Sequence, residues 1–120
     1  MKPLHWSPAA VRDLDQAASW YGDQGGEALE IGFIDAVESV VKLIEAHPGA
    51  GSALHADLLP SLSAPLRFHP VRRFDGYLVY YVELPAHISI VRIWNAARGM
   101  GAFFEDDEPT PDIGSQYSGY

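Results

Sequence analysis

Apolar residues in the first part of the chain recur at helical spacing. The first such stretch follows Ser7-Pro8, a pair typical of a helix start: serine caps the free amides, and proline at the first helical position leaves no donor unpaired. Its apolar residues lie three or four positions apart: Val11, Leu14, Ala18 and Tyr21. Gly22 and the Gly25-Gly26 pair predict its end.

A wider apolar stripe predicts a second helix over about residues 27–46, ended by His47-Pro48-Gly49. The stripe consists of Leu29, Phe33, Val37, Val40, Val41 and Ile44. The link at residues 24–26 is short, so we expect the two helices to be antiparallel neighbours. Neither helix would be stable alone, so both apolar stripes must pack on each other and on a further element.

After residue 65 the apolar pattern changes from the helical period to alternation. Residues 66–74 predict a strand interrupted by Pro70, which indicates a bulge or a position with no paired donor. Asp75-Gly76 is a strong hairpin signal, and strands are predicted over residues 77–84 and 88–94. Alternation in the last strand predicts one face made of Ile88, Ile90, Arg92 and Trp94. Residues 2–6 are compatible with a short first strand.

These elements predict an α+β fold, an N-terminal antiparallel helical hairpin packed on a small antiparallel β-sheet. The 120 residues fit one domain over residues 1–104, followed by a flexible acidic tail over residues 105–120. The connection over residues 49–65 is long, and a helical turn is possible at residues 54–59. We find no signal peptide and no apolar run near ~20 residues, and expect a cytoplasmic protein that does not enter a membrane.

The positive charge of the chain is concentrated in its middle. The formal net charge is -8, which argues against a general nucleic-acid binder. Residues 64–104 nevertheless carry five arginines against two acidic residues. The arginines are Arg67, Arg72, Arg73, Arg92 and Arg98. Two interpretations remain open: a solvated sheet face with ordinary arginine scatter, or a basic recognition face.

The sequence gives no sign of a catalytic, metal or cofactor site. Cysteine is absent, which excludes disulfides and thiolate metal ligands. The five histidines do not lie at ligand spacing, and no phosphate-binding glycine loop or nucleophile elbow occurs. We therefore expect no cofactor, no bound metal and no catalytic residue.

Four segments, taken in order, resemble the RelE/ParE superfamily of toxins from type II toxin–antitoxin modules, and the ParE branch more closely. They are Leu4-His5-Trp6-Ser7-Pro8-Ala9-Ala10 with Asp13-Leu14; Ala28, Phe33, Val41 and Leu43 with Pro48-x-x-Gly51; Leu66-Arg67-x-x-Pro70-Val71 with Tyr77-Leu78-Val79-Tyr80-Tyr81; and Ile88-x-Ile90-Val91-Arg92-Ile93 with Ala97-Arg98. The resemblance covers about residues 1–107. The chain has Asn95 where the family usually has histidine, and Gly99 where aspartate commonly follows the arginine.

The resemblance implies a plasmid-stabilisation type of toxin, neutralised by a cognate ParD-like antitoxin whose C-terminal segment wraps across the hairpin and the sheet. It implies a toxin–antitoxin hetero-oligomer that meets DNA only through the antitoxin, and DNA gyrase as the target. The five arginines are then candidate contacts for an acidic antitoxin segment or for the target. Internal pairing is the alternative for Arg92, and simple solvation is the alternative for Arg72 and Arg73.

Two other functions stay open. The RelE branch cuts messenger RNA on the ribosome, and its members often have a tyrosine six residues after an arginine near the C-terminus. That position here is Phe104, which cannot transfer a proton, so the non-enzymatic ParE-like function is favoured. The third possibility is a family member that binds an antitoxin without being toxic, which Asn95, Gly99 and the acidic tail keep open.

Overall fold

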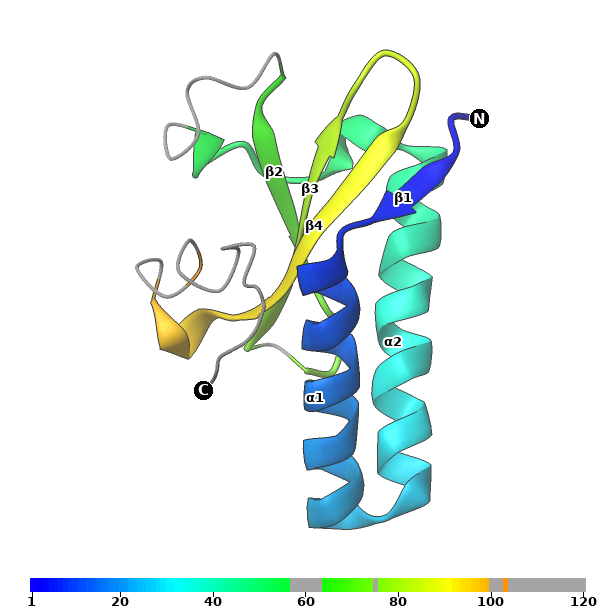
Figure 1. Ribbon diagram of the computed structural model, residues 1–120, viewed down its shortest axis with the longest axis vertical. Helices are drawn as coiled ribbons and strands as arrows, with labels where there is room; N and C mark the ends of the chain where they lie inside the picture. The colour runs from blue at the N-terminus through cyan, green and yellow to red at the C-terminus, as the bar shows by residue number, and fades with distance from the viewer. Residues whose placement is uncertain (57–63, 75, 100–102, 104–120) are drawn as a thin grey trace.

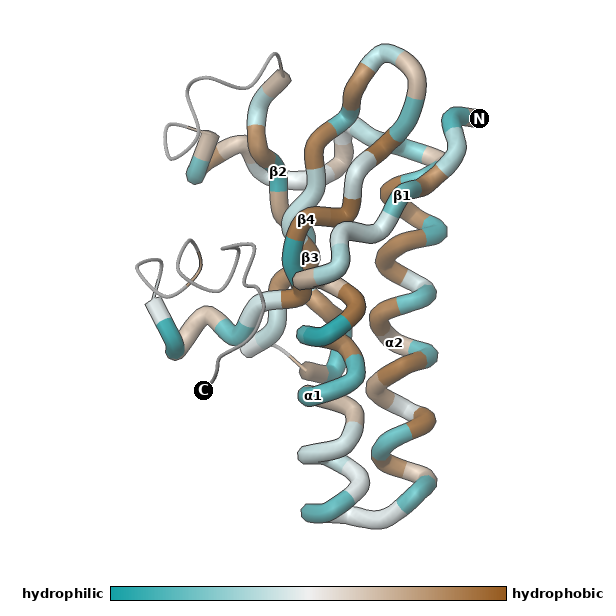
Figure 2. The backbone as a smooth tube through the Cα atoms, in the orientation of Figure 1, coloured by the Kyte–Doolittle hydropathy of each residue, from teal (hydrophilic) through white to brown (hydrophobic). Residues whose placement is uncertain are grey.

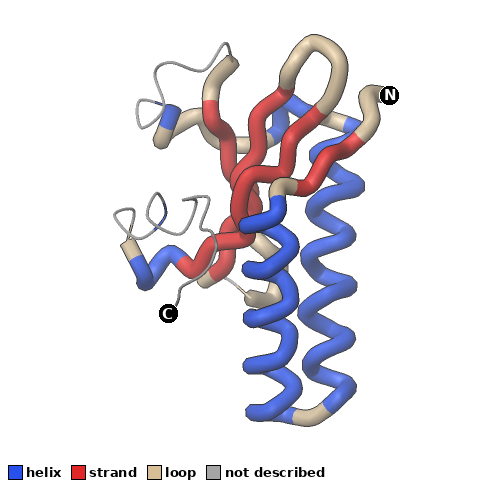
Figure 3. The backbone as a smooth tube through the Cα atoms, viewed as in Figure 1, coloured by secondary structure: helices blue, strands red, loops and turns tan. Residues whose placement is uncertain are grey.

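Two antiparallel helices pack against one face of a four-stranded sheet (Figures 1 and 3). The computed structural model describes residues 1–56, 64–74, 76–99 and 103. Its elements are β1 (Leu4–Trp6), α1 (Pro8–Gly25), α2 (Glu27–Ala46), the 3-10 turn η1 (Pro48–Ala50), β2 (Leu66–Pro70), β3 (Tyr77–Glu83), β4 (Ile88–Asn95) and the 3-10 turn η3 (Ala96–Arg98). The predicted α+β class is confirmed.

The helical hairpin begins and ends as the local signals predict. Ala10 N donates to Ser7 Oγ over 3.0 Å, so Ser7 is the N-cap of α1. The helix continues past Gly22 and stops at Gly26, whose φ of 91° lies in the left-handed region that glycine tolerates. The second helix follows at once and has the predicted bounds. Neither described helix has the length and apolar character needed to cross a bilayer.

The sheet has the order β1-β4-β3-β2 and is mixed. Strands β2, β3 and β4 are antiparallel neighbours, as predicted, but β1 joins the edge of β4 in parallel. Strand β2 ends at Pro70, so residues 71–74 do not continue the strand predicted over residues 66–74. The predicted turn at residue 75, the tail over 105–120 and half of the predicted helical turn at 54–59 lie outside the described residues.

A bulge in β4 overturns the predicted faces of that strand. Tyr81 pairs with Ile90 while Tyr80 pairs with Arg92, so Val91 is an extra residue in the ladder. One extra residue reverses the alternation beyond it. Ile90 therefore packs against the helices, while Trp94 packs on the opposite face.

Apolar side chains cover both faces of the sheet. The larger cluster lies between the sheet and the helices, and hydrophobic positions recur on successive turns of α2 (Figure 2). Its largest members include Phe33, Ile44, Tyr81, Ile88, Ile90 and Ile93. A second cluster on the other face contains Leu66, Tyr80, Val82, Trp94 and Phe103. The second face is thus partly covered as well, and its aromatic residues pack with one another.

The start of α1 covers the edge of β4 that β1 leaves open. Ser7 N donates to Ile90 O over 2.9 Å, and Ser7 Oγ donates to Val91 O over 2.7 Å. Two residues further along the strand, Ile93 N donates to Asp13 Oδ2 over 3.0 Å. An exposed strand edge is a template for unwanted pairing with other chains. Here Ser7 and Asp13 bond the free backbone groups along this edge of β4.

Candidate partner-binding site

The five arginines predicted as partner contacts do not share one surface. Only Arg72 and Arg73 stand together as exposed neighbours, at the turn after β2. Arg67 is half-buried beside Gly51, and Arg92 is 2% exposed. Arg98 is the exposed last residue of η3, and its guanidinium carbon lies 4.4 Å from the centroid of the Trp94 ring. The basic segment of the sequence is therefore distributed over separate places in the fold.

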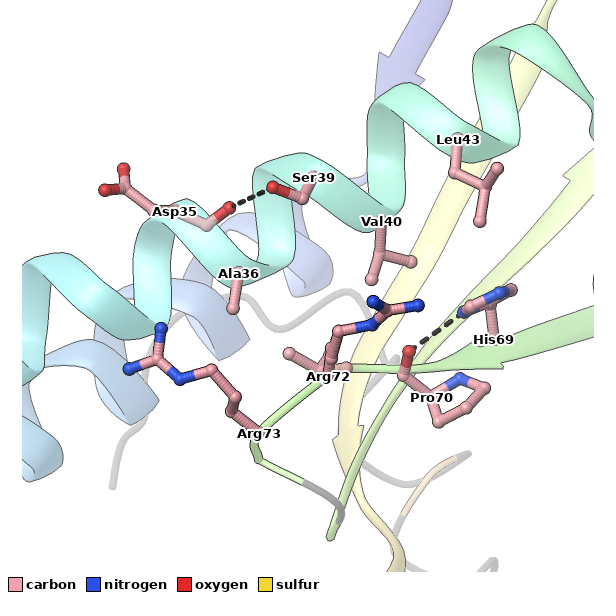
Figure 4. Close-up of a pocket in the computed structure, with 10 residues that line it drawn as sticks. Asp35, Ala36, Ser39, Val40, Leu43, His69, Pro70, Arg72 and Arg73 are labelled. Carbon is pink, nitrogen blue, oxygen red and sulfur yellow. Dashed lines mark hydrogen bonds between the residues drawn. The ribbon is translucent and has the colours of Figure 1, made fainter.

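A groove runs between α2 and the turn that follows β2, and Arg72 and Arg73 line it (Figure 4). Its volume is about 550 Å³. One wall is formed by successive turns of α2: Asp35, Ala36, Ser39, Val40 and Leu43. The other wall is formed by the end of β2 and the turn: His69, Pro70, Val71, Arg72 and Arg73.

The turn is fixed by backbone bonds and by two buried side chains. Phe74 N donates to Val71 O over 3.1 Å, which leaves Arg72 and Arg73 as the central residues of the turn. Val71 N donates to Tyr77 O over 2.9 Å, so the turn is tied to the next strand. The side chains of Val71 and Phe74 are buried in the main core. These anchors hold both arginines at the surface.

Both guanidinium groups point toward α2 in Figure 4. Arg73 also lies over the Phe74 ring, with its guanidinium carbon 5.5 Å from the centroid. The Arg73 guanidinium also reaches α2 at Gly32, where a Cβ would stand 3.6 Å from a guanidinium nitrogen, an ordinary contact distance. The carboxylate of Asp35 points away from the arginines. Among the described residues, the salt bridges are Lys2–Glu83 and Arg92–Asp13, neither of which lies in the groove.

The groove thus combines an apolar floor with two cationic groups. Val40 and Val71 are buried at its base, while Leu43 is 38% exposed along the helix wall. Such a surface can receive an apolar side chain and a neighbouring carboxylate of a partner. It offers no metal ligand set: no group of three or more metal-binding side chains occurs in the part of the chain that the structure describes.

Arg92 is an internal cation. Its Nε and Nη2 donate to the two carboxylate oxygens of Asp13, each over 2.7 Å, and its Nη1 donates to Phe103 O over 2.8 Å. The Asp13 side chain is 7% exposed. Of the two possibilities that the sequence left open for Arg92, the structure supports internal pairing, and we leave Arg92 out of the proposed contact surface.

Sequence reasoning missed Asp13 as the partner of Arg92. The signal was present: Ala9, Ala10 and Ala17 form the buried face of α1, and Asp13 is an acidic residue on that same face. A carboxylate on a buried helix face needs a charged partner. The sequence does not show which of the five arginines that partner is.

Arg67 and Tyr81 hold the loop after α2. Tyr81 Oη donates to Pro48 O over 2.6 Å and accepts from Gly51 N over 2.8 Å, while Arg67 Nη1 donates to Gly51 O over 2.9 Å. Burial raises the pKa of Tyr81, although the bond from Gly51 and the nearby Arg67 partly oppose the shift. We assign Arg67 to loop anchoring. A role for Tyr81 beyond sheet packing was not foreseen from the sequence.

Arg98 lines a second, more polar concavity at the start of α1. Arg12, Asp13, Gln16, Arg92 and Arg98 surround a volume of about 270 Å³. An adjoining hollow of about 170 Å³ includes Trp20, which is 54% exposed. Asn95 lines this hollow and caps η3 by accepting from Ala97 N. Phe104 lies outside the described residues.

Comparison with known proteins agrees with this fold. Residues 4–100 match the family model described as the ParE toxin of the type II toxin–antitoxin system, parDE. A solved structure described as the chromosomal ParDE TA system from P. aeruginosa is similar in fold, with a TM-score of 0.63 and 22% sequence identity. The match covers 79% of this chain and 96% of that chain. No curated protein matches the sequence.

Proposed function

This chain belongs to the family of ParE toxins of type II toxin–antitoxin systems, and on that premise we propose that it acts by binding a protein target and is neutralised by a cognate antitoxin. The proposed antitoxin is ParD-like, and the proposed target is DNA gyrase, as the ParE branch implies. Both encounters would take place in the cytoplasm. In this proposal the chain works by occupying a surface of its target and has no catalytic residue.

The observation that carries the proposal is the groove between α2 and the turn after β2. Two exposed arginines stand beside an apolar floor, on a protein whose net charge is -8. Arginine beside buried apolar surface is a frequent composition of protein-interface hot spots. The similar solved structure is described as a ParDE TA system, which supports a ParD-like partner for this chain.

Co-expression tests the antitoxin partner. The tagged chain is produced with the protein encoded by the neighbouring small open reading frame, and the purified material is analysed by size-exclusion chromatography. We expect one stable hetero-oligomer. The double variant R72A/R73A should weaken it, while K42A, which removes a positive charge from α2 outside the groove, should not. Recovery of the chain alone would refute the proposed partner.

A supercoiling assay tests the target. Purified chain should inhibit gyrase and trap cleaved DNA, and added antitoxin should reverse both effects. No effect at high protein concentration would count against gyrase. Primer extension on cellular messenger RNA after induction distinguishes the enzymatic alternative from the proposed function. Cleavage at particular codons would identify a ribosome-dependent endoribonuclease and overturn the proposed mode of action.

A further inference from the structure

One residue in the groove has a backbone conformation unsuited to its type. Arg73 has a φ of 75° and is the one non-glycine residue with a positive φ in the part of the chain that the structure describes. It is the third residue of the turn closed by Phe74 N and Val71 O. When φ is positive at this place in a turn, glycine or asparagine is the usual residue. A side chain with a Cβ is strained there.

The internal contacts of Arg73 do not explain why arginine stands at this strained position. Its ring contact with Phe74 is made at the surface, where such contacts are weaker than the strain of a left-handed backbone. Its approach to α2 at Gly32 is an ordinary van der Waals contact. Backbone strain that persists beside a groove is a reason to look for a function of the side chain.

We propose that Arg73 is a specificity-determining residue of the groove, and that its left-handed turn holds the guanidinium in place to bind a carboxylate on an acidic amphipathic helix of the partner. An apolar side chain of that helix would pack against Ala36 and Leu43 on the helix wall of the groove, and Arg72 would contact the same acidic face. The inference rests on the proposed function, with the cognate antitoxin as the partner.

A helix suits this groove better than an added strand. Phe68 and Ser52 already exchange both backbone bonds, over 2.8 and 2.9 Å, on the outer edge of β2. The next position that faces the same way is Pro70, which has no amide hydrogen to give to another strand. Strand addition is therefore blocked at this end of the sheet. A helix needs no edge bonds, and it presents apolar and acidic side chains on adjoining faces.

Charge complementarity decides the chemistry of the partner. The arginines have no acidic partner among the described groove residues, since the Asp35 carboxylate points away from them. A carboxylate beside an arginine guanidinium gains charge-assisted hydrogen bonds that a neutral side chain cannot match. The partner helix should therefore carry glutamate or aspartate next to its apolar anchor.

Three substitutions at one position separate strain from recognition. R73G removes both the strain and the charge, R73A removes the charge and keeps the strain, and R73K keeps both. K42A is the control for the loss of one positive charge on α2. Each full-length variant is measured for thermal unfolding and for its affinity toward the antitoxin encoded beside the chain.

R73G should raise Tm by about 4 °C, because glycine adopts the positive φ of this position without strain. It should nevertheless weaken antitoxin binding by about 10- to 100-fold, the range for losing a hydrogen bond to a charged group. R73A should bind as weakly as R73G without the gain in Tm. R73K should retain more affinity than either, and K42A should bind like the wild type.

The outcomes distinguish this inference from the proposed function. If the wild-type chain binds the antitoxin and R73G and R73A bind equally well, Arg73 is no recognition residue and the inference fails alone. If R73G lowers Tm, the turn is not strained and the argument that led to Arg73 is wrong. If the wild-type chain binds no antitoxin, the proposed function fails and the inference with it.

Discussion

Removing the carboxylate of Asp13 should be among the most damaging single changes to this fold. Asp13 holds Arg92 by two bonds of 2.7 Å and also accepts the amide of Ile93. The D13A variant removes the carboxylate that pairs with a buried guanidinium, and it removes the acceptor of the Ile93 amide. Breaking one partner of a buried ion pair typically costs about 3–5 kcal/mol. The whole stability of a domain is only about 5–15 kcal/mol.

Thermal and urea unfolding measure this loss. With a Tm shift of about 4 °C per kcal/mol for a domain of this size, D13A should lower Tm by about 12–20 °C. E83A is the matched control, because it removes the carboxylate of the other salt bridge, whose side chains are 35% and 39% exposed. An exposed pair contributes less than about 1 kcal/mol, so E83A should unfold close to the wild type.

A double variant tests the mechanism of the loss. D13A/R92M also replaces the buried guanidinium by an apolar side chain, and it should be more stable than D13A alone, because an apolar pair removes the cost of burying a cation beside the lost carboxylate. If D13A unfolds within about 1 kcal/mol of the wild type, the pair is not the buried link that its geometry indicates. If D13A/R92M is less stable than D13A, uncompensated charge is not the cause of the loss.

Further predictions concern the loop anchor and the helix cap. Y81F removes the hydroxyl that bonds Pro48 and Gly51, and urea unfolding should show a loss of about 1–3 kcal/mol. Burial raises the pKa of Tyr81 above its ordinary value of 10.0. The stability from its neutral hydroxyl is therefore full below that value and lost as pH rises through the folded-state pKa, so Tm measured against pH should fall above pH 10. Y81F should show a shallower fall, and an equal one would contradict this assignment. S7A removes the cap of α1 and the bond to Val91 O, and calorimetry should show a loss of about 1–2 kcal/mol. Unchanged unfolding of S7A would contradict the capping role.

The helices were predictable because local residues determine them. Ser7-Pro8 marks the start of α1, and the stripe from Leu29 to Ile44 marks α2. Both signals involve residues that are close in the sequence, so the position of each helix along the chain can be read without knowing the tertiary contacts. The edge position and parallel direction of β1 depend instead on pairing with residues more than eighty positions away. The spacing of apolar residues within a segment carries no information about such a pairing.

The bulge at Val91 shows why the last strand was misread. Alternation assumes one residue per ladder position, and β4 has one more than its partner between Ile90 and Arg92. No glycine or proline marks that place in the sequence. The bulge sends Arg92 and Trp94 to the face opposite Ile90, and it lets Arg92 reach Asp13. A register change of this kind follows from the tertiary fit of the strand.

The candidate site was predictable in part. The sequence identified Arg72 and Arg73 as exposed candidates beside a turn, and the structure places both in a groove. It did not indicate that α2 supplies the other wall, since that contact joins residues far apart in the chain. It also did not indicate the left-handed φ of Arg73, because no glycine or asparagine stands there. Arg67 and Arg92 looked equivalent to the groove arginines until their internal partners were known.

Growth after induction tests the central claim most directly. Cells carrying the chain under an inducible promoter are compared with cells that also express the neighbouring open reading frame, and colony counts are followed over time. We predict growth arrest with the chain alone and recovery when the antitoxin is co-expressed. Normal growth with the chain alone, at protein levels confirmed by immunoblot, would contradict the proposal that this family member is a toxin.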